Sequence, residues 1–483
     1  MDKHIGRKTV LGNLIWRFGE RICAQGISFA VSIILARLIA PSEYGLISMV
    51  TVFTSLLQIF IDSGFSSALI QKDKADELDF STVFIFNIVM CIALYTILYI
   101  CSPAIAAFYD YPDMTPVIRV MGLGLIIAGV RGVQQAYISK NMLFKKFFFS
   151  TILGTIISAV VGIVMAYQGF GVWALVAQGL VNNLIGTICL WCTVSWRPKM
   201  KFSLKRLTEL VGFGWKILVS SLLSSGYTKL SQLFIGKIYS SESLAYYNKG
   251  EQLPHLLITN LNTSIDSVIF PAMAIVQNDL KTLKEMTRRA IRVSSYILWP
   301  AMLGLCAVAT PLVRMLFTNT WIDMVPYLQI YCLIYVFQPI HTANLNAIKA
   351  MGKSDIFLKL EIMKKGIGLL LLFVTLWHGP FWIAVGILIN TLISAVINAY
   401  PNRKLLNYSL IEQIKDIIPS IVMSFIMAIC VTLIGRIGFT DVLTLVIQVI
   451  SGIIIYFMLS LVIKDSSLKY IIDIIKEILK NKS

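Results

Sequence analysis

Apolar runs long enough to cross a lipid bilayer recur along the whole chain. A membrane-spanning helix needs about 20 mainly apolar residues, and fourteen stretches approach or exceed this length with short polar connections between them. They lie at approximately 12–37, 44–70, 81–108, 114–138, 147–167, 171–195, 208–238, 244–275, 290–316, 325–350, 357–377, 380–400, 415–436 and 441–463. Because a helix satisfies its own backbone hydrogen bonds inside lipid, this pattern predicts an all-α polytopic membrane protein.

Similarity between the two halves of the chain predicts an internal repeat. The paired segments are 37–46 with 237–246, 169–176 with 379–385, and Gln135-Ala136 with Asn346-Ala347. The predicted divisions are an N-terminal lobe at 1–200 (spans 1–6), a C-terminal lobe at 201–405 (spans 7–12), two extra spans at 406–464 and an amphipathic cytoplasmic tail at 465–483. Two parallel lobes related by pseudo-twofold symmetry form one transporter architecture, in which the binding site lies between the lobes.

The composition supports a membrane protein and excludes two other classes. Of the 483 residues, 57% are hydrophobic and 14% are charged, against roughly a quarter charged in a soluble domain. A soluble enzyme of this size needs more polar surface, and a disordered chain needs lower hydrophobicity. No P-loop motif and no cluster of His, Cys and acidic residues is present, so we predict neither ATP hydrolysis nor a metal centre or cofactor.

The net charge of +17 has two candidate origins, a nucleic-acid surface or the loop charges of a membrane protein. With a cytoplasmic N-terminus and alternating spans, 28 of the 42 lysines and arginines fall in cytoplasmic segments, and only Arg314 and Arg436 in outer loops. This asymmetry follows the positive-inside rule, whereas a nucleic-acid surface would not alternate with span number. We therefore predict that both termini are cytoplasmic and that nucleic acid is not a partner.

Twelve cations remain within or at the ends of spans, where a charge at a helix centre costs about 2.5–3.5 kcal/mol. Arg17, Glu20 and Arg21 share one face of the first span, which therefore needs a wet cavity. Glu20 can neutralise one arginine and leaves the other for an anion, although an internal salt bridge that only joins helices is the alternative. The residues predicted to line a cationic, substrate-binding cavity are Arg17, Arg21, Arg131, Lys216, Lys229 and Lys249.

Few acids accompany these cations inside the spans. The candidates for supporting the cavity, or for coupling transport to an ion, are Glu20, Asp62, Glu251 and Asp266. Arg37 and Lys237 end spans 1 and 7 and are expected at the outer rim. A cavity with this excess of cations suits an anionic cargo, and the planar guanidinium of arginine matches phosphate oxygens.

The loop 197–206 between spans 6 and 7 is both basic and amphipathic. This pattern predicts contact with the anionic inner leaflet. The alternative is that its cations only fix the topology.

Four segments resemble the multidrug/oligosaccharidyl-lipid/polysaccharide (MOP) exporter superfamily, and within it the polysaccharide transport branch. They are Leu35–Leu46 (LARLIAPSEYGL), Asp62–Ala68 (DSGFSSA), Gly171–Leu175 (GVWAL) and Tyr246–Gly250 (YYNKG). The similarity extends over essentially the whole chain and is greatest to Wzx-type flippases of the colanic-acid and teichuronic-acid exporter kind. It implies a MATE/MurJ-like fold of fourteen transmembrane helices.

Members of this branch flip undecaprenyl-pyrophosphate-linked oligosaccharide from the inner to the outer leaflet of the bacterial cytoplasmic membrane, for lipopolysaccharide or exopolysaccharide biosynthesis. The resemblance implies a transporter and not an enzyme, with this lipid, the bilayer and polysaccharide polymerase or assembly proteins as partners. The related lipid II flippase has cavity arginines in helix 1 and a basic residue in helix 8, and Arg17, Arg21 and Lys249 occupy the same helices here.

Two other functions stay open at this point. One is a cation-coupled exporter of drugs or cations from the same superfamily, for which an acidic cavity is expected. The other is a non-transporting membrane scaffold for glycan assembly, in which the buried charges are dispensable.

Overall fold

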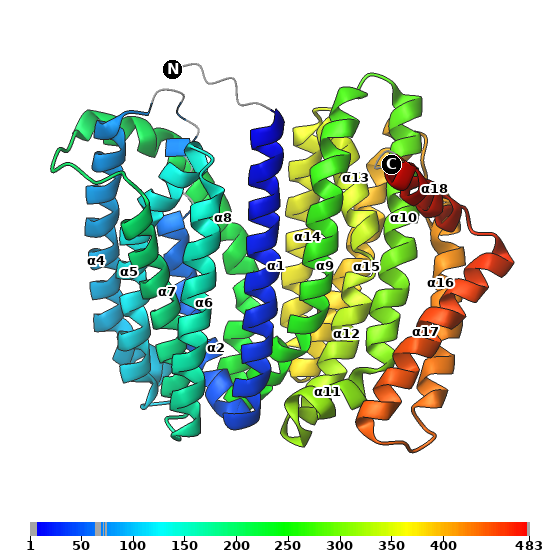
Figure 1. The fold of residues 1–483 in the computed structure, drawn as a ribbon, viewed down its shortest axis with the longest axis horizontal. Coiled ribbons are helices and arrows are strands. Elements are labelled where there is room, and N and C mark those ends of the chain that lie inside the picture. Colours follow the sequence, from blue (N-terminus) through cyan, green and yellow to red (C-terminus); the bar gives the residue numbers. More distant parts are fainter. Residues whose placement is uncertain (1–6, 63–68, 71, 73–74, 481–483) are drawn as a thin grey trace. The chain divides into compact units, whose positions relative to one another are not determined.

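Helices form every regular element among the residues that the structure, a computed structural model, describes: 7–62, 69–70, 72 and 75–480 (Figure 1). The first eight labelled helices are α1 Arg7–Leu38, α2 Pro41–Asp62, α4 Glu77–Phe108, α5 Met114–Lys140, α6 Phe144–Tyr167, α7 Val172–Thr193, α8 Leu204–Ile238 and α9 Ser241–Ile275. The others are α10 Leu280–Ala307, α11 Ala309–Phe317, the 3-10 helix η1 Asn319–Met324, α12 Val325–Tyr335, α13 Gln338–Ala350, α14 Ser354–Thr375, α15 Pro380–Leu405, α16 Leu410–Ile434, α17 Asp441–Ile463 and α18 Ser466–Lys480. The prediction of an all-α protein is confirmed.

Eleven of the described helical segments are long and apolar enough to cross a membrane. The helices at three further predicted spans, α8, α9 and α14, have 35, 35 and 22 residues and carry more polar side chains. The chain is a multi-pass membrane protein, and the count of fourteen spans remains a prediction.

Two predicted spans are interrupted. The stretch 290–316 contains the end of α10, a break at Val308 and α11, and the stretch 325–350 is broken between α12 and α13 at Val336 and Phe337. Pro339 explains the second break, because proline has no N–H to donate to the carbonyl of Tyr335 four residues earlier. The final part of the predicted span 44–70 includes residues 63–68, which lie outside the described residues.

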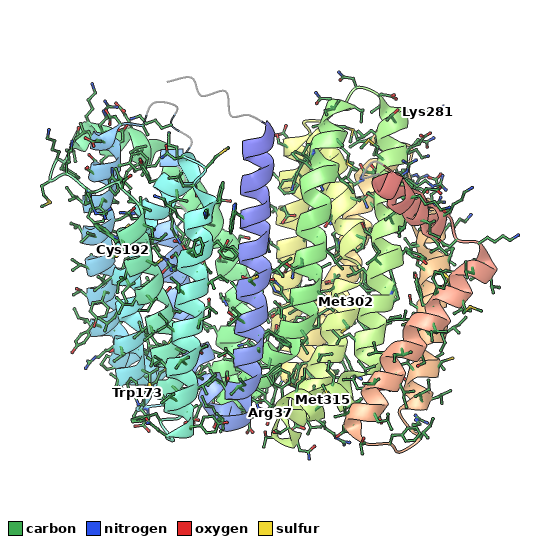
Figure 2. All side chains as sticks on the ribbon, viewed as in Figure 1. Arg37, Trp173, Cys192, Lys281, Met302 and Met315 are labelled. Atoms are coloured by element: carbon green, nitrogen blue, oxygen red, sulfur yellow. The ribbon has the colours of Figure 1, made fainter. Side chains whose placement is uncertain are left out.

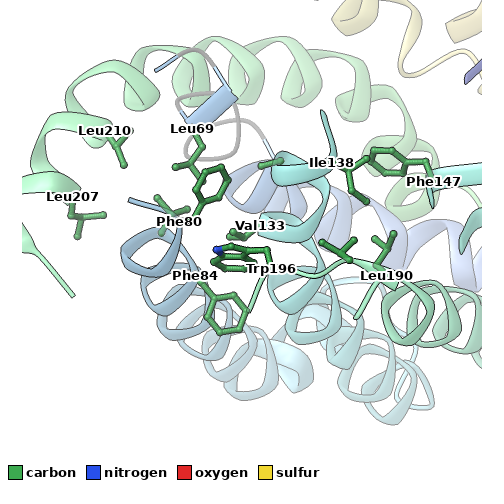
Figure 3. Close-up of a cluster of buried hydrophobic side chains, with 13 residues drawn as sticks. Leu69, Phe80, Phe84, Val133, Ile138, Phe147, Leu190, Trp196, Leu207 and Leu210 are labelled. Carbon is green, nitrogen blue, oxygen red and sulfur yellow. The ribbon is translucent and has the colours of Figure 1, made fainter. Parts of the chain in front are cut away.

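The chain divides into two compact units, an N-terminal unit at 1–245 and a C-terminal unit at 246–483. In the N-terminal unit, α6 packs along α7, α4 along α5, α1 along α6, and α2 against α5 and α8. One of its apolar clusters surrounds Trp196, whose ring centroid lies 5.7 Å from that of Phe80 and 6.2 Å from that of Phe84 (Figure 3). This cluster fixes the connection from α7 to α8 against the start of α4.

In the C-terminal unit, α10 packs on α16, α14 on α15, and α13 between α10 and α15. A pair of tyrosines adds α17 to this core: the Tyr296 hydroxyl donates to Ser460 Oγ at 2.8 Å, and the Tyr456 hydroxyl donates to the Tyr296 carbonyl at 2.8 Å. The tail contains α18, as the amphipathic pattern predicts, and Arg289 of α10 lies 4.9 Å from the ring centroid of Tyr470 in α18.

Helix boundaries recur along the chain at nearly constant intervals. Helices α1 and α8 end at Leu38 and Ile238, α2 and α9 begin at Pro41 and Ser241, and α5 and α13 end at Lys140 and Ala350. Left-handed backbone conformations recur in the same register, at Met142 and Gly352 and at Gly169 and Gly379. These intervals support the repeat, whose boundaries at 200 and 405 remain a prediction.

Candidate functional site

The predicted arginine face of α1 is described in part. Glu20 is buried, with 8% of its surface exposed, and Arg21 is half-buried. Trp16 packs on Phe148 of α6 with 5.2 Å between ring centroids. The side chain of Arg17 lies outside the described part of the structure. Helix α1 therefore carries Glu20 and Arg21 along a face that is not simply exposed to lipid.

Arg131 of α5 and Asp62 of α2 lie near enough to each other inside the N-terminal unit for their opposite charges to attract. Gln58 donates from Nε2 to both carboxylate oxygens of Asp62 at 3.1 Å. The Nε atom of Arg131 is buried and has no hydrogen-bond partner among the described residues. The structure thus brings together one predicted cavity cation and one predicted supporting acid.

A cavity of about 250 Å³ opens between α2, α5 and α7. Its polar lining comes from Thr51, Thr54, Ser55 and Gln58 of α2 and from Asn183 of α7. Thr51 donates its hydroxyl hydrogen to Ile47 O at 2.7 Å within α2. Its oxygen lone pairs therefore remain available to accept hydrogen bonds.

The lysines of α8 differ in their surroundings. Lys229 donates to Gln232 Oε1 at 2.9 Å, whereas the side chain of Lys216 lies outside the described residues. Lys237 pairs with Asp110 at 2.6 Å and lies 5.4 Å from the ring centroid of Phe108. Both Lys237 and the exposed Arg37 lie at helix ends; Figure 2 shows Arg37 at the same end of the N-terminal unit as Trp173.

Lys249 of α9 is packed among aromatic rings. It has 9% of its surface exposed, and its ammonium lies 5.9 Å from the ring centroids of both Phe317 and Trp321. Next to it, Gly250 allows α9 to approach Tyr327, whose Cβ would lie 2.5 Å from a Cβ placed on the glycine. The YYNKG segment therefore joins α9 to η1 and α12, and Lys249 lies within this contact.

Glu251, one residue further along α9, accepts a hydrogen bond from the Tyr335 hydroxyl at 2.6 Å. The side chain of Asp266, the other acid predicted for α9, lies outside the described residues. Among the described residues, no three His, Cys, Asp or Glu side chains come together as a candidate metal site.

An acidic centre that the sequence interpretation missed joins α10 to α16. Arg288 donates two hydrogen bonds of 2.7 Å to Asp416, and Arg292 also pairs with this carboxylate. Tyr408, in the connection before α16, donates to Asp416 Oδ2 at 2.8 Å. Burial and this bond to a carboxylate raise the pKa of Tyr408, which therefore stays a donor. The signal available in the sequence is an arginine pair spaced by four, together with an acid, Asp416, at the start of an apolar run.

A second missed centre holds the loop 197–206. Asp79 of α4 is fully buried and pairs with Lys72 at 2.8 Å and Arg206 at 3.6 Å. Lys199 pairs with Glu77, and its backbone N–H donates to Ser81 Oγ at 3.0 Å. Part of the basic charge of this loop is therefore used within the protein. Its apolar side chains Met200 and Leu204 are 92% and 67% exposed, and contact with the inner leaflet stays a prediction.

The sequence of residues 34–326 matches the polysaccharide biosynthesis protein family. The chain belongs to this family. The chain is 23% identical over 351 residues to the teichuronic acid biosynthesis protein TuaB of Bacillus subtilis. The aligned region covers 72% of this chain and 73% of TuaB. It is 24% identical over 366 residues to the lipopolysaccharide biosynthesis protein WzxC of Escherichia coli, covering 74% of this chain and 73% of WzxC.

The fold of this family member matches solved transporters. The lipid II flippase MurJ in an inward closed conformation superposes with a TM-score of 0.76 and 15% identity, covering 94% of this chain and 98% of MurJ. An inward-facing multidrug resistance MATE transporter of the MOP superfamily gives a TM-score of 0.60 at 17% identity, covering 79% of this chain and 94% of that one. The expected MATE/MurJ-like fold is confirmed.

Proposed function

We propose that this protein flips undecaprenyl-pyrophosphate-linked oligosaccharide from the inner to the outer leaflet of the bacterial cytoplasmic membrane by alternating access. The observation that carries the proposal is the presence of basic side chains along transmembrane helices of a flippase-like fold, with Arg21 on α1 and Arg131 on α5. Intramembrane charges of this kind mark a substrate path, because they are costly next to lipid.

The proposed site is cationic and receives the pyrophosphate. Arg17, Arg21 and Arg131 supply guanidinium groups for the phosphate oxygens, while Lys216, Lys229 and Lys249 add positive charge. Arginine suits this role, because its fork of N–H donors matches two oxygens at once. Glu20 and Asp62 balance part of the charge.

The membrane potential supplies a driving force for this cargo. With both termini cytoplasmic, transport moves an anion out of an inside-negative cell. Moving one elementary charge is worth about 2.3 kcal/mol per 100 mV, so a diphosphate with roughly two charges gains several kcal/mol when no counter-ion accompanies it.

Substitution of the α1 arginines tests the proposal. We expect Arg17→Ala with Arg21→Ala to abolish surface glycan and to cause its lipid-linked precursor to accumulate, while the protein still inserts in the membrane. Arg436→Ala, which removes a cation that follows α16, is the matched control and should export normally. Normal surface glycan in the double variant, at normal protein level, contradicts the proposal. Efflux of cationic dyes by the wild-type protein would indicate a drug exporter instead.

A further inference from the structure

A row of tyrosines on α12 faces a row of polar residues on α9 in the C-terminal unit. Tyr327, Tyr331 and Tyr335 are spaced by four, as are Tyr247, Glu251 and His255, so each set occupies one helix face. The rings of Tyr331 and Tyr335 are stacked with centroids 6.0 Å apart, and Tyr247 meets Tyr331 edge-on at 5.6 Å. We call Glu251, His255 and Tyr335 the α9–α12 seam.

The two rows run from the protein core, at Tyr247 and Tyr331, to an accessible end, where the seam lies. Tyr247 and Tyr331 are 2% and 3% exposed, Glu251 and Tyr335 are half-buried, and His255 is exposed. At this end the Tyr335 ring meets His255 edge-on at 6.0 Å, and its hydroxyl donates to Glu251 at 2.6 Å. A carboxylate and a histidine are costly next to lipid, so the accessible end of the seam faces water and not acyl chains.

Hydrogen-bonding groups extend beyond Tyr335 across the break between α12 and α13. Pro339 cannot donate to the Tyr335 carbonyl, so the helical hydrogen-bond ladder is interrupted at this level. One turn further, Thr342 donates to Asn262 Oδ1 at 2.8 Å, and Gln338 donates to Thr342 at 3.3 Å. The seam therefore joins an aromatic ring to a continuous polar row.

The residues at the corresponding positions of the N-terminal unit line a cavity. The recurring helix boundaries relate Thr51 and Ser55 to Glu251 and His255, and Met121 and Leu125 to Tyr331 and Tyr335. All four residues of the N-terminal unit line the cavity of about 250 Å³ between α2, α5 and α7. Large aromatic and ionisable side chains are thus specific to the seam, and helix packing in this fold does not require them.

We propose that the α9–α12 seam binds the sugar part of the cargo and contributes to glycan selectivity. This inference rests on the proposed function. The carbon-bound hydrogens of a pyranose ring form an apolar face that packs on an aromatic ring such as that of Tyr335, and sugar hydroxyls donate to an ionised carboxylate such as that of Glu251. A carboxylate repels pyrophosphate, so the charge of Glu251 favours the hydroxyl-rich end of the cargo over its phosphates.

Two lipids separate sugar recognition from pyrophosphate recognition. One is bare undecaprenyl pyrophosphate, and the other is lipid-linked oligosaccharide extracted from cells depleted of this protein. Binding of each to the purified full-length protein in nanodiscs is measured for the wild type and for Glu251→Gln. We expect Glu251→Gln to weaken binding of the glycosylated lipid about tenfold, as for loss of one charge-assisted hydrogen bond, with binding of the bare lipid unchanged.

Three further variants make the result specific. Tyr335→Phe keeps the ring and should retain most glycan binding, whereas Tyr335→Ala should lose it. Glu361→Gln, which removes an acid paired with Lys364 on α14, is the matched control and should bind both lipids normally.

The outcomes distinguish failure of the sugar site from failure of the proposed flippase function. An equal loss for both lipids in Glu251→Gln, or no loss for either, overturns the sugar site. Wild-type protein that binds neither lipid contradicts the proposed function itself.

Discussion

The Glu43 carboxylate accepts a hydrogen bond from the backbone N–H of Val172 at 3.2 Å. This contact places an acid of the first turn of α2 at the N-terminus of α7, where unpaired N–H groups and the helix dipole favour negative charge. It also connects two segments that carry the family resemblance, PSEYG and GVWAL, which lie 129 residues apart. Their shared role here is to hold α2 against α7.

Gly171 should be the most sensitive position of this contact. It has a φ of +52°, and a Cβ at this residue would lie 2.1 Å from Glu43 Oε1. We expect Gly171→Ala to lower stability by about 2 kcal/mol or more, from left-handed strain and displacement of Glu43. Thermal unfolding of the protein in detergent measures the change. Gly179→Ala, inside α7 in a position with open space around it, should not lower the melting temperature, because alanine is the better helix former. An equal fall in the two variants would contradict the assignment.

Asp416 should hold α10 and α16 together. Its side chain is 2% exposed, and it binds Arg288, Arg292 and Tyr408. Because the arginines are partly solvated, we expect Asp416→Asn to cost about 1–3 kcal/mol, seen as a lower melting temperature. Asp441→Asn, at the exposed start of α17, is the matched control. A wild-type melting temperature for Asp416→Asn would show that the cluster does not contribute to stability.

Asp76 is the N-cap residue of α4. The stability that this cap contributes should depend on pH. The backbone N–H of Asp79 donates to Asp76 at 2.9 Å and, with nearby Arg206 and Lys72, lowers the pKa of Asp76. Since the folded-state pKa is depressed, the stabilisation is present above the unfolded pKa of about 3.9 and is lost as pH falls through the lower folded value. The difference in melting temperature between wild type and Asp76→Asn should therefore shrink below about pH 4. A difference that is constant from pH 7 to pH 3 would contradict this role.

The sequence predicted the long helices well where apolar runs end at charges or at glycine, as at Lys140 of α5 and Gly171 before α7. It missed the breaks at Val308 and at Val336, because averaging over an apolar run conceals local interruptions, even though Pro339 is visible in the sequence. Pairing across the chain was also beyond a pattern analysis. Asp416 meets Arg288 across 128 residues, so no local spacing identifies the pair.

The sequence identified which side chains of the candidate site are ionisable, but not which residues surround them. Ionisable side chains in apolar spans identified Asp62 and Arg131 separately, and the structure places them near each other in the N-terminal unit. The surroundings of Lys249 were not predictable. They depend on Phe317 of α11 and Trp321 of η1, which are far from Lys249 in the sequence. Several cations counted only for topology, such as Lys199 and Arg206, also hold a loop to α4.

Movement of the lipid-linked oligosaccharide between leaflets tests the central claim most directly. The purified protein is reconstituted into vesicles together with oligosaccharide-bearing lipid extracted from depleted cells, and a membrane-impermeant periodate treatment reports which leaflet holds the sugar. We expect vesicles with wild-type protein to expose nearly all of the lipid-linked sugar to oxidation over time, while vesicles with Arg17→Ala and Arg21→Ala expose only the outer half. Equal protection of the sugar with and without the wild-type protein would contradict a flippase.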